Sequence, residues 1–236
     1  MLSNLPLENI LFLDIETVPA YPDYKSLPDK FRKLWDKKAV RINYNEEEFD
    51  DEETYQKAGI YAEFGKIVCI SCGFMNGNEI RLKSFYGDDE FILLEEFAKL
   101  LKQHYSSPSA LLCAHNGKEF DYPYIARRML INGIELPDIL DLAGKKPWEI
   151  QHLDTMELWK FGDYKHYTSL ELLAAVFNIP TPKDDIDGSQ VSKVYWIEKD
   201  LDRIAKYCEK DVLTTVQLFR KYQGLPLIRD EFVVIS

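Results

Sequence analysis

The sequence predicts one α/β domain in which a mixed β-sheet is flanked by helices. Short apolar runs with strand character alternate along the chain with longer segments of helical periodicity. Two of the strand-like runs are joined by Asn76-Gly77-Asn78, a strong hairpin signal because Asn and Gly tolerate positive φ. With 236 residues the chain can bury a substantial core, and we expect a single domain over residues 1–236.

The expected elements follow in chain order. A buried strand at 9–13 leads into a proline-punctuated insertion at about 19–65, which holds a helix near 29–38 and an acidic run at 46–53. We interpret the acidic run as a solvated loop or helix face. The remaining elements are strands at 66–75 and 79–86, a helix at 88–104, a strand at 110–114, a helix at 122–131, a short strand at 149–153, a helix at 169–178 and a helical pattern at 197–223.

Composition and charge restrict the function. Lys and Arg total 29 against 40 for Asp and Glu, and this net charge of -11 argues against tight, non-specific binding of duplex DNA. An enzyme that holds a strand end through bound cations is less constrained, because the cations supply the positive charge at the phosphate. Acidity therefore disfavours a coating protein and leaves a nuclease possible.

The apolar segments and the cysteines indicate the compartment. The first apolar stretch, at 10–13, is too short for a signal-peptide core or a membrane span, so we expect a cytoplasmic protein without membrane contact. Cys69, Cys72, Cys113 and Cys208 include one Cys-x-x-Cys pair and no second pair at zinc-site spacing. Buried free thiols are the favoured interpretation.

Two carboxylates follow the first strand. Asp14 and Glu16 are two residues apart, so strand alternation directs both side chains to the same face while Ile15 points to the other. Two carboxylates on one face can share a cation. Taken alone, the pair is equally compatible with ordinary surface acids at an exposed strand end.

Two further motifs carry acidic residues. Asp121 follows Phe120 after a buried strand and opens a helix, where an Asp can simply be the helix N-cap. Tyr207 and Asp211 are four residues apart in the terminal helix, hence on one helical face, and we expect the intervening Glu209 and Lys210 to point elsewhere. Each motif alone has a structural explanation.

In this order and context the motifs resemble those of a known superfamily. D-x-E on the first strand, F-D opening a helix and Y-x-x-x-D late in the chain resemble the three exonuclease motifs of the DnaQ-like, RNase H-fold superfamily. Tyr207 in place of His is typical of its DEDDy branch. The runs 61–68, 187–191 and 207–212 are similar to those of the predicted 3′→5′ exonucleases related to the proofreading domain of family B DNA polymerases, the PolB-like group.

The resemblance implies an RNase H-like mixed sheet and a metal-dependent 3′→5′ exonuclease that acts on single-stranded DNA and releases nucleoside 5′-monophosphates. It implies that Tyr207 aims the attacking water, and that two Mg²⁺ or Mn²⁺ ions are held by Asp14, Glu16, Asp121 and Asp211. It also implies that substrate contacts come from Thr17 beside the sugar, Asn116 near the terminal nucleotide and Phe120 against a base.

Other interpretations remain open at this point. RNA is the rival substrate, because only contacts to the 2′-hydroxyl distinguish it from DNA, and a catalytically silent nucleic-acid-binding module is the rival function. A polymerase or repair partner and the oligomeric state are undetermined. Asp154 either supports the site or caps the next helix. Five basic residues either line a path for the substrate strand or are solvated surface charges. They are Arg127, Arg128, Lys145, Lys146 and Lys165.

Overall fold

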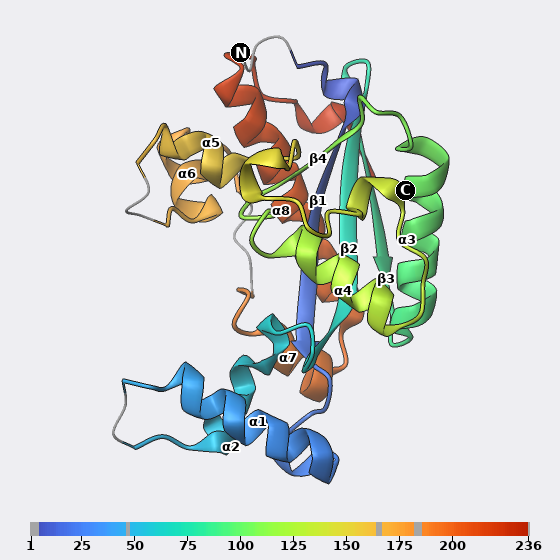
Figure 1. Cartoon of the computed structure of the whole chain (residues 1–236). Helices are drawn as coiled ribbons and strands as arrows, with labels where there is room; N and C mark the ends of the chain where they lie inside the picture. Colours follow the sequence, from blue (N-terminus) through green and yellow to red (C-terminus); the bar gives the residue numbers. More distant parts are fainter. Residues whose placement is uncertain (1–4, 46–47, 164–166, 182–185, 236) are drawn as a thin grey trace.

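The computed structural model describes residues 5–45, 48–163, 167–181 and 186–235. Its centre is a six-stranded sheet with the order β5-β4-β1-β2-β3-β6 (Figure 1). β1 and β2 pair antiparallel, as do β2 and β3, whereas the other three pairs are parallel, so the expected mixed sheet is confirmed. The strands are β1 (Ile10–Pro19), β2 (Gly65–Asn76), β3 (Glu79–Tyr86), β4 (Leu111–Ala114), β5 (Leu153–Asp154) and β6 (Val233–Ile235).

Helices cover both faces of this sheet. The alternation of β1 divides its apolar side chains: Leu11 and Leu13 join a core with α3 (Glu90–His104) and α4 (Asp121–Ile131). Ile10 and Phe12 join a separate core with α8 (Leu201–Tyr222). The other α-helices of the described residues are α1 (Asp29–Ile42), α2 (Asp51–Thr54), α5 (Thr155–Lys160), α6 (Leu170–Val176) and α7 (Val191–Lys193).

β1 is longer than the sequence predicts. Its pairing with β2 continues to Pro19, whereas its parallel pairing with β4 is recorded only through Phe12. The expectation that Asp14 stands at the C-terminal end of the strand was therefore wrong. Asp14 and Glu16 lie inside β1, in the part that pairs with β2. This part begins just beyond Phe12, the last residue paired with β4.

Two other boundaries differ from expectation for local reasons. The terminal helix α8 begins at Leu201 rather than at 197, because Lys199 adopts φ 59° and Asp200 caps the helix by accepting from the Arg203 amide. β5 is confined to Leu153–Asp154 because Pro147–Glu149 forms a 3₁₀ turn. The predicted hairpin and the helices α3, α4 and α6 agree with the sequence to within a few residues.

The insertion folds around an aromatic core of its own. Trp35 of α1 is fully buried, and its ring lies 5.2 Å from the ring of Tyr55 and 5.1 Å from that of Phe64. Figure 1 shows this segment beyond the end of β1 that is farther from the N-terminus. Of the acidic run, residues 46–47 lie outside the described residues and Asp51–Thr54 forms α2. One domain with an insertion at about 19–65 remains our proposal.

Two simpler expectations concern the thiols and the membrane. All four cysteines are buried free thiols, as predicted. Within the described ranges, no helix combines the length and the apolar character needed to cross a bilayer.

A buried ion pair joins the insertion to the sheet and its helices. Glu90 of α3 accepts from the backbone N–H of Ile67 at 2.7 Å and from Arg128 Nε at 2.8 Å. Arg128 Nη1 also donates to the carbonyl oxygen of Ala62 at 2.8 Å. Because Arg128 is buried in this pair, it is neither a solvated charge nor part of a strand path, and both expectations for it were wrong.

We predict that Arg128→Met destabilises the protein by about 3–5 kcal/mol, because it leaves the Glu90 carboxylate buried without its cation. The free energy of unfolding from urea titration measures this. Arg127→Met removes the exposed neighbouring charge and should change stability by no more than about 0.5 kcal/mol. A cost below about 1 kcal/mol for Arg128→Met would contradict the structural role of the pair.

Candidate active site

β1 contributes the first two carboxylates. Asp14 and Glu16 lie opposite Ser71 and Cys69 of β2, and a register shift follows Glu16. Ile15, between them, is buried in the core on the other face of the sheet. The alternation predicted from the sequence therefore holds, and it leaves Glu16 only 8% exposed.

α8 supplies the opposite wall of the site. Phe219 anchors this helix by an edge contact with Phe12 of β1, their ring centroids being 5.6 Å apart. Tyr207 and Asp211, one turn apart, then lie over β1, where the Tyr207 hydroxyl hydrogen-bonds the Asp211 carboxylate. Tyr207 and Asp211, which the sequence places on one helical face, thus form a hydrogen bond with each other.

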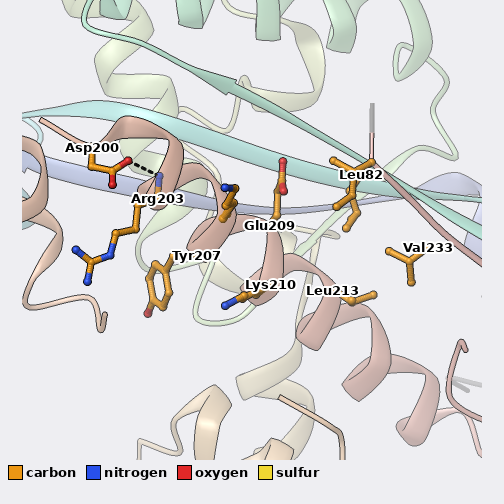
Figure 2. A pocket seen from close by; sticks show the side chains of 10 residues that line it. Leu82, Asp200, Arg203, Tyr207, Glu209, Lys210, Leu213 and Val233 are labelled. Carbon is orange, nitrogen blue, oxygen red and sulfur yellow. Dashed lines mark hydrogen bonds between the residues drawn. The ribbon is translucent and has the colours of Figure 1, made fainter. Parts of the chain in front are cut away.

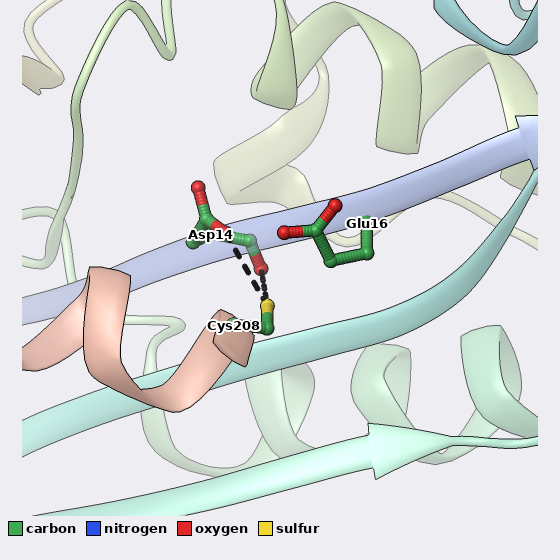
Figure 3. Close-up of side chains that lie close together, drawn as sticks. All are labelled: Asp14, Glu16 and Cys208. Carbon is green, nitrogen blue, oxygen red and sulfur yellow. Dashed lines mark hydrogen bonds between the residues drawn. The ribbon is translucent and has the colours of Figure 1, made fainter. Parts of the chain in front are cut away.

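Cys208 is a neighbour that the sequence reasoning missed. Its thiol Sγ lies 3.3 Å from the carbonyl oxygen of Asp14 and 3.3 Å from Asp14 Oδ2 (Figure 3). One possible ligand atom each from Asp14, Glu16 and Cys208 lie within 4.8 Å of one another, the one such group found among the described residues. A signal was available: Cys208 precedes Asp211 by three residues and therefore shares its helical face.

Asp121 approaches the site from α4. Phe120 occupies the N-cap position and Asp121 is the first helical residue, so the alternative explanation of Asp121 as a simple helix N-cap does not hold. Its carboxylate instead accepts from the backbone N–H of Ile15, on the side of β1 that β4 leaves open. Asp121 Oδ1 is buried and has no hydrogen-bond partner among the described residues. A buried acceptor left in this state costs free energy unless a ligand satisfies it.

Asp154 holds the loop that carries Asn116. Its Oδ1 accepts from the backbone amides of Asn116 at 3.0 Å and Met156 at 2.9 Å, while Oδ2 accepts from the Lys118 amide at 3.1 Å. Asp154 therefore both caps α5 and supports the site, so the two roles left open are filled together. Asn116, held at φ 64°, keeps its side-chain Oδ1 buried and without a partner among the described residues.

The loop residues beside Asn116 have structural roles. A Cβ on Gly117 would meet the Cβ of Ala114 at 2.5 Å and Cζ of Tyr122 at 2.9 Å, so only glycine fits. The two ring nitrogens of His115 each lie 2.9 Å from a partner, the Thr155 hydroxyl and a backbone carbonyl. His115 is thus a hydrogen-bonded structural histidine.

Thr17 and Phe120, two of the expected substrate contacts, meet around Tyr124. The Thr17 side chain hydrogen-bonds Tyr124, and the ring of Phe120 lies 5.3 Å from the Tyr124 ring. The Tyr124 hydroxyl donates to the carbonyl oxygen of Gly59 at 2.7 Å. Tyr124 therefore fixes both residues relative to the insertion.

The carboxylates repel one another strongly. Burial, followed by the negative charges of Glu16, Asp121 and Asp211, raises the pKa of Asp14 well above its ordinary value. Burial and then Asp211 raise the pKa of Glu16 in the same way, and burial raises the pKa of Asp121 to about 7. Burial and the same acids also raise the pKa of Tyr207, which makes this phenol a poor base.

The carboxylates border an open cleft. It has a volume of about 900 Å³, and its lining includes Asp14, Asp211, Tyr207, Gln190 and Lys210. The expectation that Lys210 points elsewhere was wrong, because a residue three positions after Tyr207 lies on an adjacent part of the helical surface. Glu209 does point elsewhere, since it accepts from the Ser84 hydroxyl at 2.7 Å.

A second hollow shares Tyr207 and Lys210 with this cleft. Its volume is about 520 Å³, and Arg203 and Lys206 contribute to its lining from the preceding turns of α8 (Figure 2). Acidic residues share this lining, because Asp200 and Glu209 also contribute to it and Arg203 lies 2.6 Å from Glu198. Neither hollow was visible in the sequence, because both depend on which helices meet.

Of the basic residues considered for a strand path, Lys165 lies outside the described residues. Arg127, Lys145 and Lys146 are exposed, and Lys146 Nζ lies 5.2 Å from the centre of the Trp148 ring. We continue to interpret these three residues as solvated charges.

The donor set fits hard divalent cations. Asp14 interacts electrostatically with Glu16, Asp121 and Asp211, and no basic side chain is among the groups that shift the pKa values of Asp14, Glu16 and Asp121. The partnerless Asp121 Oδ1 is a further acceptor for a cation. Carboxylate oxygens suit Mg²⁺ and Mn²⁺, while the adjacent Cys208 thiol, with its pKa raised by burial, stays neutral.

Crowded carboxylates on an α/β fold form a site that hard divalent cations can occupy. The chain belongs to the family of predicted 3′-5′ exonucleases related to the exonuclease domain of PolB, whose profile matches residues 60–231. The expected PolB-like membership is thereby confirmed, and domains of this type use divalent metals.

Individual relatives agree with this membership. The chain is 25% identical over 220 residues to a DNA polymerase of Pyrococcus glycovorans and 24% identical over 220 residues to one of Thermococcus gorgonarius. Each match covers 83% of this chain and 28% of the relative, so the chain spans little more than a quarter of those polymerases.

A solved structure shows the same fold. The family B DNA polymerase of Pyrobaculum calidifontis matches 90% of this chain and 24% of its own, with a TM-score of 0.56 at 17% identity. The expected RNase H-like α/β fold is confirmed.

We predict that Asp121→Asn stabilises the metal-free protein as pH rises. Burial raises the Asp121 pKa to about 7 from an ordinary 3.8, so its favourable contribution is present below about pH 4 and is lost as pH rises through about 7. In chelator, the melting temperature of Asp121→Asn should therefore exceed that of the wild type more at pH 8 than at pH 4.5.

The exposed Asp138→Asn is the matched control and should show no such pH-dependent gain. Millimolar Mn²⁺ should raise the melting temperature of the wild type more than that of Asp121→Asn. If the difference in melting temperature between Asp121→Asn and the wild type in chelator does not change with pH, the crowding of carboxylates does not strain the fold.

Proposed function

We propose that the protein is a metal-dependent 3′→5′ exonuclease that removes nucleoside 5′-monophosphates from the 3′ end of single-stranded DNA. The observation that carries the proposal is the meeting of four acidic side chains from β1, α4 and α8 beside Tyr207. Family membership supplies the reaction class, and the cleft of about 900 Å³ beside the acids gives a strand end access to them.

Four residues are assigned to two Mg²⁺ or Mn²⁺ ions. Asp14, which repels each of the other three acids, is the candidate for sharing between both ions. Glu16 and Asp211 would help to hold one ion, and Asp121 with its unpartnered Oδ1 would help to hold the other. When bound, such ions lower the pKa of a coordinated water and offset the charge of the scissile phosphate.

Tyr207 is assigned a positioning role. Its raised pKa excludes proton abstraction near neutral pH, but its hydroxyl is already oriented by Asp211. From there it can hold a water in line with the phosphorus. Lys210 and Lys206, from the same helix, add positive charge that attracts the phosphate backbone.

Three residues are assigned to the terminal nucleotide. Asn116 offers its buried, unpartnered Oδ1, Phe120 offers a half-buried ring, and Thr17 lies beside the same tyrosine as Phe120. A stacking contact is tolerant of sequence, which suits an enzyme that degrades any strand. RNA is the alternative substrate, and a catalytically silent binding module is disfavoured because every expected acid is present at the site.

We predict that linear single-stranded DNA is degraded in Mn²⁺ while the same sequence in circular form survives. The reason is that the net charge of -11 disfavours internal binding, so that the reaction depends on a strand end. Gel analysis of 5′-labelled DNA should show a ladder that shortens from the 3′ end, with chelator as the blank. Equal loss of circles would indicate an endonuclease, and faster loss of RNA would reassign the substrate.

We predict different effects for the two bonded residues of α8. Asp211→Ala removes a metal ligand and should abolish detectable hydrolysis and reduce the rise in melting temperature with Mn²⁺. Tyr207→Phe removes only the hydroxyl, so single-turnover rates should fall by roughly 10²- to 10⁴-fold while metal stabilisation survives.

The matched control is Tyr86→Phe, whose hydroxyl donates to Asp202 at 2.9 Å and which should retain the wild-type rate. Wild-type single-turnover rates in Tyr207→Phe would reduce Tyr207 to a packing residue. Activity in both α8 variants would assign the hydrolysis to another site.

A further inference from the structure

Helix α1 of the insertion has a charge opposite to that of the protein. Its 14 residues, Asp29–Ile42, include two acidic residues and six basic ones, in a chain whose net charge is -11. Basic residues are common on solvated helices, but such a local excess in an acidic protein is unexpected from composition. The arrangement of these basic residues on the helix determines which kind of ligand they can bind.

Four of the six basic residues form one stripe. At 3.6 residues per turn, the spacings of three, four and four residues place them along a single face about 16 Å long. All four are exposed, and the stripe consists of Lys30, Lys33, Lys37 and Arg41. Leu34, which is 45% exposed, lies along the same face, and Tyr44, which is 79% exposed, follows the C-terminal end of the helix.

The opposite face of α1 is committed to the fold. It carries Trp35 and Ala39, which are fully buried in the core of the insertion. The acidic helix α2 packs on that side, since Trp35 Nε1 donates to the carbonyl oxygen of Asp51 at 3.2 Å. The stripe is therefore turned away from the acids of α2.

The two acidic residues of α1 are also directed elsewhere. Asp36 accepts from the Tyr24 hydroxyl at 2.7 Å, and Asp29 lies 3.7 Å from Arg32. Both sit to the side of the stripe on the helical surface. Within the described part of the chain, no salt bridge connects any of the four stripe residues to an acid.

The insertion is tied to the element that carries Asp121. α4 contributes both ties, because Tyr124 donates to the carbonyl oxygen of Gly59 and Arg128 to that of Ala62. β1, which carries Asp14 and Glu16, also runs directly toward the insertion (Figure 1). The residues from Glu16 to Pro19 span about 10 Å of strand. The stripe thus has a fixed relation to the carboxylate site.

We propose that the α1 stripe is a binding surface for single-stranded polynucleotide, which holds the part of the strand on the 5′ side of the end being hydrolysed. This inference rests on the proposed exonuclease function and adds a second, sequence-independent contact to it. Four cations in a row match the repeating charge of a phosphate backbone, and the exposed Leu34 and Tyr44 offer surfaces to unstacked bases.

This surface explains how an acidic enzyme retains its substrate. The local excess of positive charge on α1 attracts a strand at a second place, away from the carboxylate site, although the net charge of the chain is -11. Short substrates reach only the carboxylate site. Longer substrates also contact α1 and bind more tightly because of it. The insertion is therefore the part of the protein that favours longer strands.

The test replaces the four stripe residues by Gln, which keeps good helix propensity. The matched control replaces Lys83, Lys99, Lys102 and Arg229, on β3, α3 and the C-terminal segment, by Gln and lowers the net charge equally. Fluorescence anisotropy in chelator measures binding of labelled oligo(dT) of about 30 nucleotides, a length above common single-strand site sizes. Circular dichroism checks that both variants are folded.

We expect the stripe variant to bind oligo(dT) at least about tenfold more weakly, with a slope of log affinity against log salt shallower by about 2 to 3. For the control variant, the slope of log affinity against log salt should equal that of the wild type. In Mn²⁺, kcat/KM for the long oligonucleotide should fall by a similar factor, whereas kcat/KM for a trinucleotide should not change.

The binding arm needs no hydrolysis, so it separates this inference from the proposed activity. Equal affinity and salt slope in wild type and stripe variant overturn the inference, as does an equal loss in the control variant. Absence of length-dependent binding by the wild type also overturns it. Binding of duplex DNA in preference to oligo(dT) would exclude single strands as the ligand of the stripe.

Discussion

The repulsion among buried carboxylates is the constraint on which the rest of the structure depends. Asp14, Glu16, Asp121 and Asp211 each come from an element that is fixed by apolar packing elsewhere, and burial raises the pKa values of the first three. The free energy that holds them together comes from the two cores on either face of β1. The fold thus stores an electrostatic strain that divalent cations can relieve, and cation binding and folding stability are coupled for this reason.

Hydrogen bonds to backbone groups, rather than contacts among the acids themselves, keep this arrangement in place. Asp154 joins the Asn116 loop to the start of α5, and Glu90 with Arg128 joins the insertion to β2 and α4. Both are buried polar groups whose partners are satisfied, so each fixes one arrangement of neighbouring elements. Two buried oxygens without a hydrogen-bond partner in the described part of the chain, Asn116 Oδ1 and Asp121 Oδ1, belong to residues assigned to the proposed ligands.

The distribution of charge separates two tasks. Acids gather at the candidate metal site, and basic residues gather on the exposed side of α1. A uniformly basic surface would bind nucleic acid anywhere along its length, whereas local basic surfaces on an acidic protein favour a strand whose end lies at the site. The net charge of the chain thus disfavours general binding of nucleic acid, and the placement of charge indicates where a strand can bind.

Sequence by itself determined the order of the main elements up to the terminal helix, the shared face of Asp14 and Glu16, and the helical face of Tyr207 and Asp211, because these follow from the local periods of strand and helix. It also supplied the family, since motif order survives where overall identity is low. It did not predict β6, which pairs with β3 at the edge of the sheet. Only the tertiary structure decided that β1 continues past its acids, that Phe120 rather than Asp121 occupies the cap position, and that Lys210 borders the cleft. Cys208 beside Asp14 and Arg128 inside an ion pair were likewise decided there. These features depend on which strand or helix lies next to which, and that choice is made by long-range packing that no local period encodes.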